Sequence, residues 1–308
     1  MGLRIANVRN QRSCGSTATT LVEEINFAFN AHSIHLDVFA LKNSGSAATV
    51  ANLIGSKLNE YRVITQNGNP ETVVSGNDAH DMIPAIFGTI PYHSQLTNTT
   101  NIPHGYGIQY FASPFWTDPL KNFGMPGGQG IQFATDWAAD GTQTFQSYVY
   151  DLTVEGVDTS DKPNSIGYTR ISRDSYTSSA VNEIRNTNIA PAKRILGVFN
   201  FMTTSFDDLA ASAAFDVTGI RSQALAFSQN IQFSYKPSRT WSMRQYQNVA
   251  SFAAAGAFIN SLDDGCFYED FGINNSGSVL GVAYQPNATI NTTAGVAEAT
   301  RVYPIALV

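Results

Sequence analysis

The stretch LIGSKLNEYRVITQNGNPETVVSG at residues 53–76 decides the fold. Two segments rich in β-branched residues, EYRVITQ and PETVVSG, flank Asn67-Gly68-Asn69 in its middle. Asn-Gly between two such segments is among the strongest short signals for a hairpin, because both turn residues need a positive φ. The stretch therefore predicts a β-hairpin, and the rest of the chain can be compared with it.

The same order of patterns returns in the second half of the chain. Residues 50–90 show a strand, a glycine, a hairpin and a short helix, and residues 214–259 repeat that order without sharing residue identities. Each half then closes on an alternating strand, at 146–156 and at 300–308. A repeat of pattern on this scale predicts two similar β-domains in tandem.

Apolar alternation and aromatic content predict about sixteen short strands along the chain. The clearest strand regions are 20–29, 34–41, 106–116, 192–206 and 266–273, and short helices are predicted at 77–88 and 244–259. Sixteen strands divided between two domains predict an all-β fold of two tandem eight-stranded jelly-roll barrels, with short helices in the connecting loops.

A break in the pattern separates the two halves. The segment VDTSDKPNS at 157–165 carries Asp, Ser and Pro without apolar periodicity, which is typical of a linker between domains. The predicted organisation is an N-terminal arm at 1–15, a first jelly roll at 16–157 and a second at 158–308. The second domain opens with a polar segment, 168–188, in which no strand is predicted.

Charge is scarce in this chain of 308 residues. Charged residues make up 14%, against roughly 25% in average soluble chains, and Asn, Gln, Ser and Thr replace them. Such a composition suits a surface covered by neighbouring molecules, and it equally suits a stable extracellular β-protein. The net charge of −6 argues against a dedicated nucleic-acid-binding protein.

The N-terminus departs from this acidic balance. Arg4, Arg9 and Arg12 all precede the first acidic residue, Glu23. A short basic arm of this kind could contact phosphates or anionic lipid head groups, and the alternative is a frayed terminus with three solvated arginines.

Cysteine use and hydropathy restrict the class of protein further. Cys14 and Cys266 lie in different halves, and without CxxC or Cys/His metal spacing they are predicted to be free thiols in a reducing compartment. The start MGLRIANVRNQRSCGS lacks the apolar core of a signal peptide. The longest apolar stretch, residues 249–259, is shorter than the ~20 residues of a membrane span.

Three stretches of the chain resemble the double jelly-roll major capsid proteins of the adenovirus and tectivirus lineage, which includes internal-membrane phages of the cortico- and finnlakevirus type. The first is the hairpin stretch at 53–76. The second is YFASPFW…FGMPGGQGIQFATDW, within 110–137, and the third is CFYEDFGINNSGSVLGVAY…TRVYPIALV, within 266–308. The resemblance covers nearly the whole chain and lies in the layout of elements.

The resemblance implies a structural, non-enzymatic major capsid protein of an icosahedral, membrane-containing virus. Three copies would form a trimer whose six barrels make a pseudo-hexagonal capsomer. The implied partners are the chain itself, neighbouring capsomers, and minor capsid or penton proteins, without a cofactor or a small-molecule substrate. The arm with Arg4, Arg9 and Arg12 would face an internal membrane or the genome. The implied location is the virion shell, after assembly in the host cytoplasm.

Candidate metal ligands are weak. Asp263 and Asp264, with Glu269 nearby, form the densest acidic cluster and are the candidates for calcium, although a turn that leads into a strand explains Asp-Asp-Gly as well. His32 and His35 stand three apart on a predicted strand, where they should point to opposite faces and not share an ion. The other histidines, His80, His93 and His104, show no metal-ligand spacing.

No catalytic or cofactor-binding residue is predicted. The adjacent Glu23 and Glu24 should face opposite sides of a strand, which disfavours a glycosidase pair. The Gly-rich segment 124–130 lacks the context of a phosphate-binding loop.

Two other functions remain open as alternatives. The first is a carbohydrate- or receptor-binding β-sandwich, such as a lectin or a viral spike or tail protein, and the second is a β-sandwich glycosidase. Trp116, Trp137 and Trp241 could form a sugar platform, although aromatic residues in β-barrels more often lie in the core.

Overall fold

A computed structural model of the chain describes the strands and their immediate connections. The described residues are 3–15, 17–26, 29–42, 57–65, 68, 70–76, 78–79, 82, 103–111, 130–139, 145–158, 168–202, 220–228, 230–235, 266–271, 281–295 and 297–308. Within these residues the chain forms eighteen β-strands. It divides into two compact units, the first ending at Thr169 and the second continuing from Arg170 to Val308.

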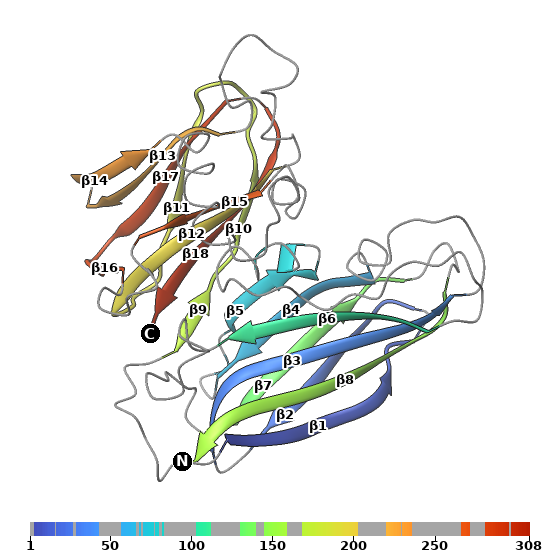
Figure 1. The fold of residues 1–308 in the computed structure, drawn as a ribbon. Coiled ribbons are helices and arrows are strands. Elements are labelled where there is room, and N and C mark those ends of the chain that lie inside the picture. The colour runs from blue at the N-terminus through green and yellow to red at the C-terminus, as the bar shows by residue number, and fades with distance from the viewer. Residues whose placement is uncertain are drawn as a thin grey trace, which may run out of the picture. The chain divides into compact units, whose positions relative to one another are not determined.

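The first unit contains eight strands in two antiparallel sheets. One sheet has the order β1-β8-β3-β6 and the other the order β2-β7-β4-β5. In Figure 1 the first of these sheets lies in front of the second. The strands are β1 (Leu3–Ser13), β2 (Thr19–Ile25), β3 (Phe29–Lys42), β4 (Leu58–Ile64), β5 (Pro70–Ser75), β6 (Pro103–Phe111), β7 (Ile131–Trp137) and β8 (Phe145–Asp158).

The second unit also has two sheets. The path β10-β18-β12-β15, with β9 beside β18 and β16 beside β12, forms one, and β11-β17-β13-β14 forms the other. The strands are β9 (Thr169–Ile171), β10 (Asp174–Thr177), β11 (Ile184–Asn188), β12 (Arg194–Met202), β13 (Ile220–Phe227), β14 (Asn230–Tyr235), β15 (Cys266–Asp270), β16 (Val282–Ala283), β17 (Ala288–Ala294) and β18 (Ala299–Leu307).

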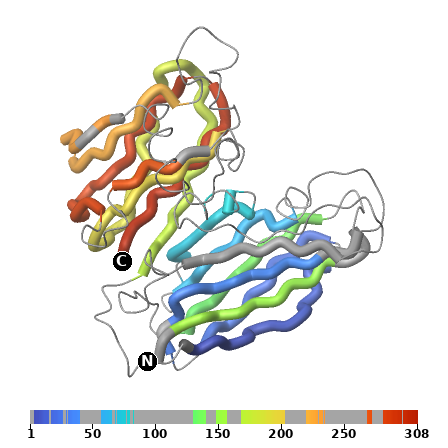
Figure 2. Tube along the Cα trace, viewed as in Figure 1, coloured from blue at the N-terminus to red at the C-terminus, as the bar shows by residue number. Residues whose placement is uncertain are grey.

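The two units repeat one topology. When β10 to β15 are set against β1 to β6, and β17 and β18 against β7 and β8, the order of strands in both sheets is the same. In each unit the last strand therefore lies beside the first, as the blue β1 and the green β8 do in Figure 2. Eight strands in two such sheets form a jelly roll, so the predicted tandem jelly-roll fold is confirmed.

The predicted hairpin is present in the first unit and has a counterpart in the second. β4 pairs antiparallel with β5, and Gly68 in the connection has a φ of +73°. β13 pairs with β14 in the same way. Of the helix predicted at 77–88, the described residues Asp78, Ala79 and Met82 are helical. The helix predicted at 244–259 lies outside the described residues.

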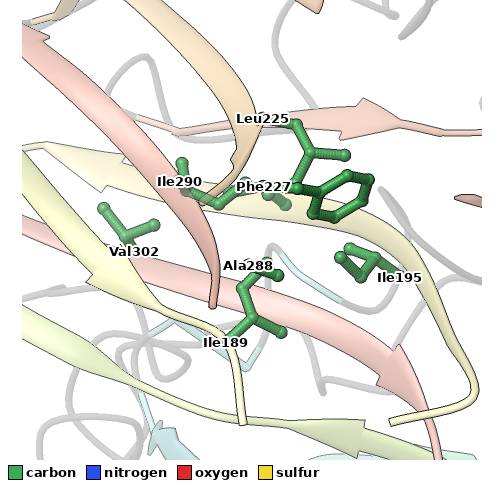
Figure 3. Close-up of a cluster of buried hydrophobic side chains, with 8 residues drawn as sticks. Ile189, Ile195, Leu225, Phe227, Ala288, Ile290 and Val302 are labelled. Atoms are coloured by element: carbon green, nitrogen blue, oxygen red, sulfur yellow. The ribbon is translucent and has the colours of Figure 1, made fainter. Parts of the chain in front are cut away.

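Apolar side chains from both sheets fill each unit. In the first unit Trp137 of β7 stacks on Tyr150 of β8, with ring centroids 5.7 Å apart. In the second unit a buried cluster combines strands of both sheets, as Figure 3 shows. Its members are Ile189, Ile195, Val198, Leu225, Phe227, Ala288, Ile290 and Val302. Burial on this scale is the main favourable term in folding.

A polar network bridges the two sheets inside the second unit. The side-chain amides of Asn200 on β12 and Gln223 on β13 exchange two hydrogen bonds of 3.2 and 2.6 Å, and Gln223 also donates to Thr292 on β17 at 3.0 Å. All three side chains are at most 1% exposed. Because these buried amides bond to one another, the network costs little and fixes how the two sheets face each other.

Two parts of the structure differ from the sequence-based expectation. The residues predicted as an N-terminal arm form β1, which pairs with β8 along its length from Leu3↔Val157 to Ser13↔Val149. The polar segment 168–188 contains the short strands β9, β10 and β11. These segments are held by backbone pairing to a neighbouring strand. Such pairing does not require alternating apolar residues, so the sequence gives no strand signal for them. The predicted domain limits at 157 and 158 stay predictions.

Candidate functional site

The three arginines of the predicted arm lie on β1, and two of them bind one buried carboxylate. Arg9 and Arg12 donate hydrogen bonds to the two carboxylate oxygens of Glu23 on β2, and the Tyr150 hydroxyl donates to Glu23 Oε1 at 2.6 Å. Glu23 is 2% exposed, whereas the Arg9 and Arg12 side chains are 53% and 34% exposed. We call Arg9, Arg12, Glu23 and Tyr150 the Glu23 clasp.

Irregular pairing brings the two arginines of the clasp together. On a regular strand, residues three apart point to opposite faces. The pairing of β1 with β8 shifts between Arg9↔Leu152 and Arg12↔Tyr150, so one extra residue is accommodated on β1. Gln11 takes a positive φ of 49° there. The bulge turns Arg12 to the same side as Arg9.

The side chains around the clasp are deeply buried. Burial raises the pKa of the Tyr150 hydroxyl, and its hydrogen bond to Glu23 raises it further. Cys14 follows β1, is 1% exposed, and burial raises the pKa of its thiol to about 12. Lys57 lies 5.1 Å from the centre of the Tyr148 ring. A buried thiol with so high a pKa is a packing group and not a nucleophile.

The strand orientation of Glu23 and Glu24 agrees with the sequence prediction. Glu23 is buried and Glu24 is exposed. The two carboxylates therefore do not face one cleft, as a pair of glycosidase acids must.

The histidines His32 and His35 are closer than their spacing predicted. Ser33 Oγ lies 3.4 Å from His32 Nδ1 and 3.0 Å from His35 Nε2, so both rings approach the same hydroxyl. The reason is a shift in the β3–β8 pairing between Ala31 and Ser33, which makes His32 the extra residue of a bulge. The expectation that the two rings point to opposite faces is therefore wrong.

An acidic pair lies on the same strands as these histidines. Asp37 on β3 pairs directly with Asp151 on β8, and the Asp151 side chain accepts a hydrogen bond of 2.5 Å from the backbone N–H of Gln11. Burial raises the pKa of Asp37; His35 lowers it and Asp151 raises it, and the net shift is upward. The main cause is burial, which disfavours the charged form of Asp37, and the carboxylate of Asp151 opposite it adds to the shift.

This shift predicts that Asp37→Asn stabilises the protein at neutral pH. A raised pKa in the folded state means that folding is opposed while Asp37 is charged, and the penalty disappears as the pH falls through that pKa. Like charges directly opposite in a sheet cost roughly 0.2–1 kcal/mol. Urea unfolding should show a gain of this size at neutral pH, and the gain should vanish below the ordinary pKa of 3.8.

Asp136→Asn is the matched control for this substitution. Asp136 accepts hydrogen bonds from Arg62 at 2.8 Å and from Thr20 at 2.6 Å, so its replacement should lower stability. A loss of stability at neutral pH in Asp37→Asn would contradict the prediction.

Of the three calcium candidates, only Glu269 lies within the described residues, so the predicted site stays a prediction. Glu269 lies on β15, is 4% exposed and pairs with Val198 in the sheet. Asp263 and Asp264 lie outside the described residues. Among the residues that the structure describes, no three His, Cys, Asp or Glu side chains form a group that could hold a metal ion.

Of the remaining candidates, Trp137 lies in the core, His104 lies on a strand, and the others lie outside the described residues. Trp137 is 1% exposed and stacks on Tyr150, so it belongs to the core and not to a sugar platform. His104 lies on β6, where it pairs with Ala40. In the part of the chain that the structure describes, no helix is long and apolar enough to cross a membrane. The candidates outside that part are Trp116, Trp241, His80 and His93.

Solved structures similar to this chain have the same double jelly roll. The major capsid protein of Sulfolobus turreted icosahedral virus matches with a TM-score of 0.66 at 8% identity, over 100% of this chain and 97% of that chain. The capsid protein of the PBCV-1 virus matches with a TM-score of 0.60 at 11% identity, over 99% of this chain and 93% of that chain.

A third match comes from a bacteriophage. The major capsid protein of bacteriophage PM2 matches with a TM-score of 0.57 at 10% identity, over 100% of this chain and 98% of that chain. No protein-family model and no curated protein matches the sequence. At these identities the likeness establishes the fold, and the chain has the double jelly-roll fold of these capsid proteins.

Proposed function

We propose that the chain is a major capsid protein whose homotrimers form pseudo-hexagonal capsomers of an icosahedral virus. The observation that carries the proposal is the full-length match: the chain aligns with 97% of the first of these capsid proteins and 98% of the third, with no large part left over on either side. The second occurrence of the same strand order within one chain supports the trimer, because three copies then present six similar barrels.

The composition supports a structural role. A shell protein buries much of its surface against neighbours, where unpaired charges are costly. The chain has 14% charged residues. A glycan-binding module would need exposed aromatic side chains on one face, and Trp137 does not provide one. We therefore propose a virion location and a non-enzymatic role, with the chain itself as the main partner.

Contacts of the N-terminal region with a membrane or the genome stay a prediction. Two of its three arginines are bound to Glu23, which reduces the positive charge that β1 offers to phosphates. Arg4, near the start of β1 and exposed, is the residue to test for such contacts. Minor capsid or penton partners and assembly in the host cytoplasm also stay predictions.

The mass of the purified chain in solution tests the proposal. Light scattering on a sizing column should give a compact species of three times 33.3 kDa that resists dilution. Electron microscopy of the concentrated protein should then show hexagonal arrays or shells. A single-chain mass at all concentrations would contradict the capsomer.

A further inference from the structure

Among the described residues, one sheet face of the second unit carries no charged side chain in the three rows that its register defines. Buried side chains on β17 alternate with half-buried ones, so Thr289, Asn291 and Thr293 lie on the face away from the core. Directly opposed residues of a sheet share a face. The register therefore gives three rows across the sheet, Ile184–Thr293–Ser222, Asn186–Asn291–Ala224–Ser234 and Asn188–Thr289–Ala226–Ile231. We call these eleven residues the uncharged face.

The equivalent face of the first unit is charged. Its register across β2, β7, β4 and β5 gives the rows Thr20–Asp136–Glu60–Ser75, Val22–Ala134–Arg62–Val73 and Glu24–Gln132–Ile64–Pro70. Four of these residues are charged, and Arg62 binds Asp136 at 2.8 Å. The jelly-roll topology itself therefore does not require an uncharged face, because the same sheet in the other unit tolerates charges.

The four strands that carry the uncharged face contain two charged residues, Arg185 and Arg221, and both form their contacts at one end of the sheet. Arg185 of β11 forms an ion pair with Glu183 at 2.5 Å and lies 5.9 Å from the centre of the Tyr176 ring. Arg221 of β13 donates to Asn182 at 2.5 Å. Both arginines contact the short turn region before β11. The middle of the face is left to the half-buried Asn and Thr side chains of β17 and to Ala224 and Ala226, which are 8% and 1% exposed.

Apolar side chains stand at both sides of this face. Ile184 on the edge strand β11 and Ile231 on the edge strand β14 are each 63% exposed. Asn186 and Asn188, beside Ile184, are exposed as well. A surface without charge, with amides and hydroxyls in the middle and exposed isoleucines at the sides, has the composition of an interface core.

We propose that the uncharged face binds a second copy of this chain through an equally uncharged surface. Asn, Thr and Ser side chains both donate and accept hydrogen bonds, so such a surface satisfies another of its own kind. A charged partner surface would leave its charges unpaired in the contact. The proposal rests on the proposed function only in requiring that the chain assembles with itself.

Charge substitutions at Asn186 test the proposal. Asn186 is exposed in the middle row on β11, so both Asn186→Lys and Asn186→Asp should fold. Val22→Lys is the matched control, because Val22 is exposed at the middle row of β2, the equivalent edge strand of the first unit. The measurements are the light-scattering mass over a dilution series, the formation of shells, and hydrogen exchange of Ile184–Asn188.

Both Asn186 variants should weaken assembly, and Val22→Lys should not. A single unpaired charge in the contact should raise the dissociation concentration by about 10- to 100-fold, or abolish shells if the face joins one trimer to the next. In the wild type, exchange of Ile184–Asn188 should slow on assembly. These results, obtained with both signs of charge, would support a contact between copies.

Other results would overturn the inference. Unchanged mass and shells in both Asn186 variants would show that the face stays free in the assembly. Tighter association in Asn186→Lys with weaker association in Asn186→Asp would indicate an anionic partner. If the wild type is a trimer and the variants assemble as the wild type does, only this interface is contradicted. If the wild type is a single chain in solution, the proposed capsomer is contradicted as well.

Discussion

Gly281→Ala is expected to destabilise the second unit severely. Gly281 is buried directly before β16, where its backbone has a φ of +61°. A Cβ atom there would lie 2.8 Å from the carbonyl carbon of Ile195 on β12, and closer still to its oxygen. Because both atoms belong to the backbone of a central strand, a rotamer change cannot relieve the clash, and β12 or β16 must move.

The expected loss is about 3 kcal/mol or more, from backbone strain of roughly 1–2 kcal/mol and from overpacking of roughly 1–3 kcal/mol. Chemical denaturation followed by tryptophan fluorescence and circular dichroism measures it. We expect a low-denaturant transition for the second unit, or a chain that does not fold at all.

Substitutions at two other glycines separate the effect of backbone strain from the effect of the steric clash. Gly68 and Gly130 have φ values of +73° and +60°, and a Cβ at either position would meet nothing within 4 Å. Gly68→Ala and Gly130→Ala should therefore lose only the strain contribution, roughly 1–2 kcal/mol. If Gly281→Ala lost no more than these two variants, the close approach to Ile195 would not matter for stability.

Local signals predicted the strands that have strong local patterns. The hairpin β4–β5 was evident from Asn67-Gly68, and β12 from the apolar run after Arg194. β12 is buried on both faces, which requires such a run. The strands that were missed depend on their neighbours. β11 buries only Thr187 of its five residues, so its sequence carries no alternation, and pairing with β17 alone defines it.

Bulges explain what the sequence did not reveal about the candidate sites. The argument on His32 and His35 relied on the rule that residues three apart on a strand point to opposite faces, and this rule fails there because the pairing shifts beside Ser33. The same kind of shift brings Arg9 and Arg12 to Glu23. A bulge is set by the partner strand and leaves little trace in the bulged segment itself. The arginine-rich start was therefore interpreted as an arm.

The clasp also explains how β1 is held although its apolar side chains from Arg4 to Ser13 are not buried. In the second unit β10, the counterpart of β1, is likewise exposed or half-buried, and the neighbouring β9 inserts Ile171, which is 1% exposed. The side chains of β1 from Arg4 to Ser13 are exposed or half-buried, and Arg9 and Arg12 bind the opposite sheet at Glu23. Backbone pairing and a buried charge thus hold the first strand in place of an apolar anchor.

Glu23→Gln is therefore expected to loosen β1 before the rest of the first unit. Glutamine keeps the shape and can still accept from the Tyr150 hydroxyl, but it cannot neutralise Arg9 and Arg12. Breaking a buried ion pair costs about 3–5 kcal/mol. Since both arginines reach solvent, we expect a smaller loss, about 2–3 kcal/mol. Urea denaturation measures the total, and hydrogen exchange should show faster exchange first at Leu3–Ser13.

Glu24→Gln provides the matched control, because it makes the same change one residue away on the exposed side of β2. Its effect should stay within about 0.5 kcal/mol, with exchange of β1 unchanged. Arg9→Met and Arg12→Met should each reproduce part of the Glu23→Gln effect, since either arginine alone still neutralises the carboxylate. If Glu23→Gln were as stable as Glu24→Gln, backbone pairing with β8 alone would be enough to hold β1. Uniform faster exchange throughout the first unit would instead mean that Glu23 stabilises the whole barrel and not its first strand.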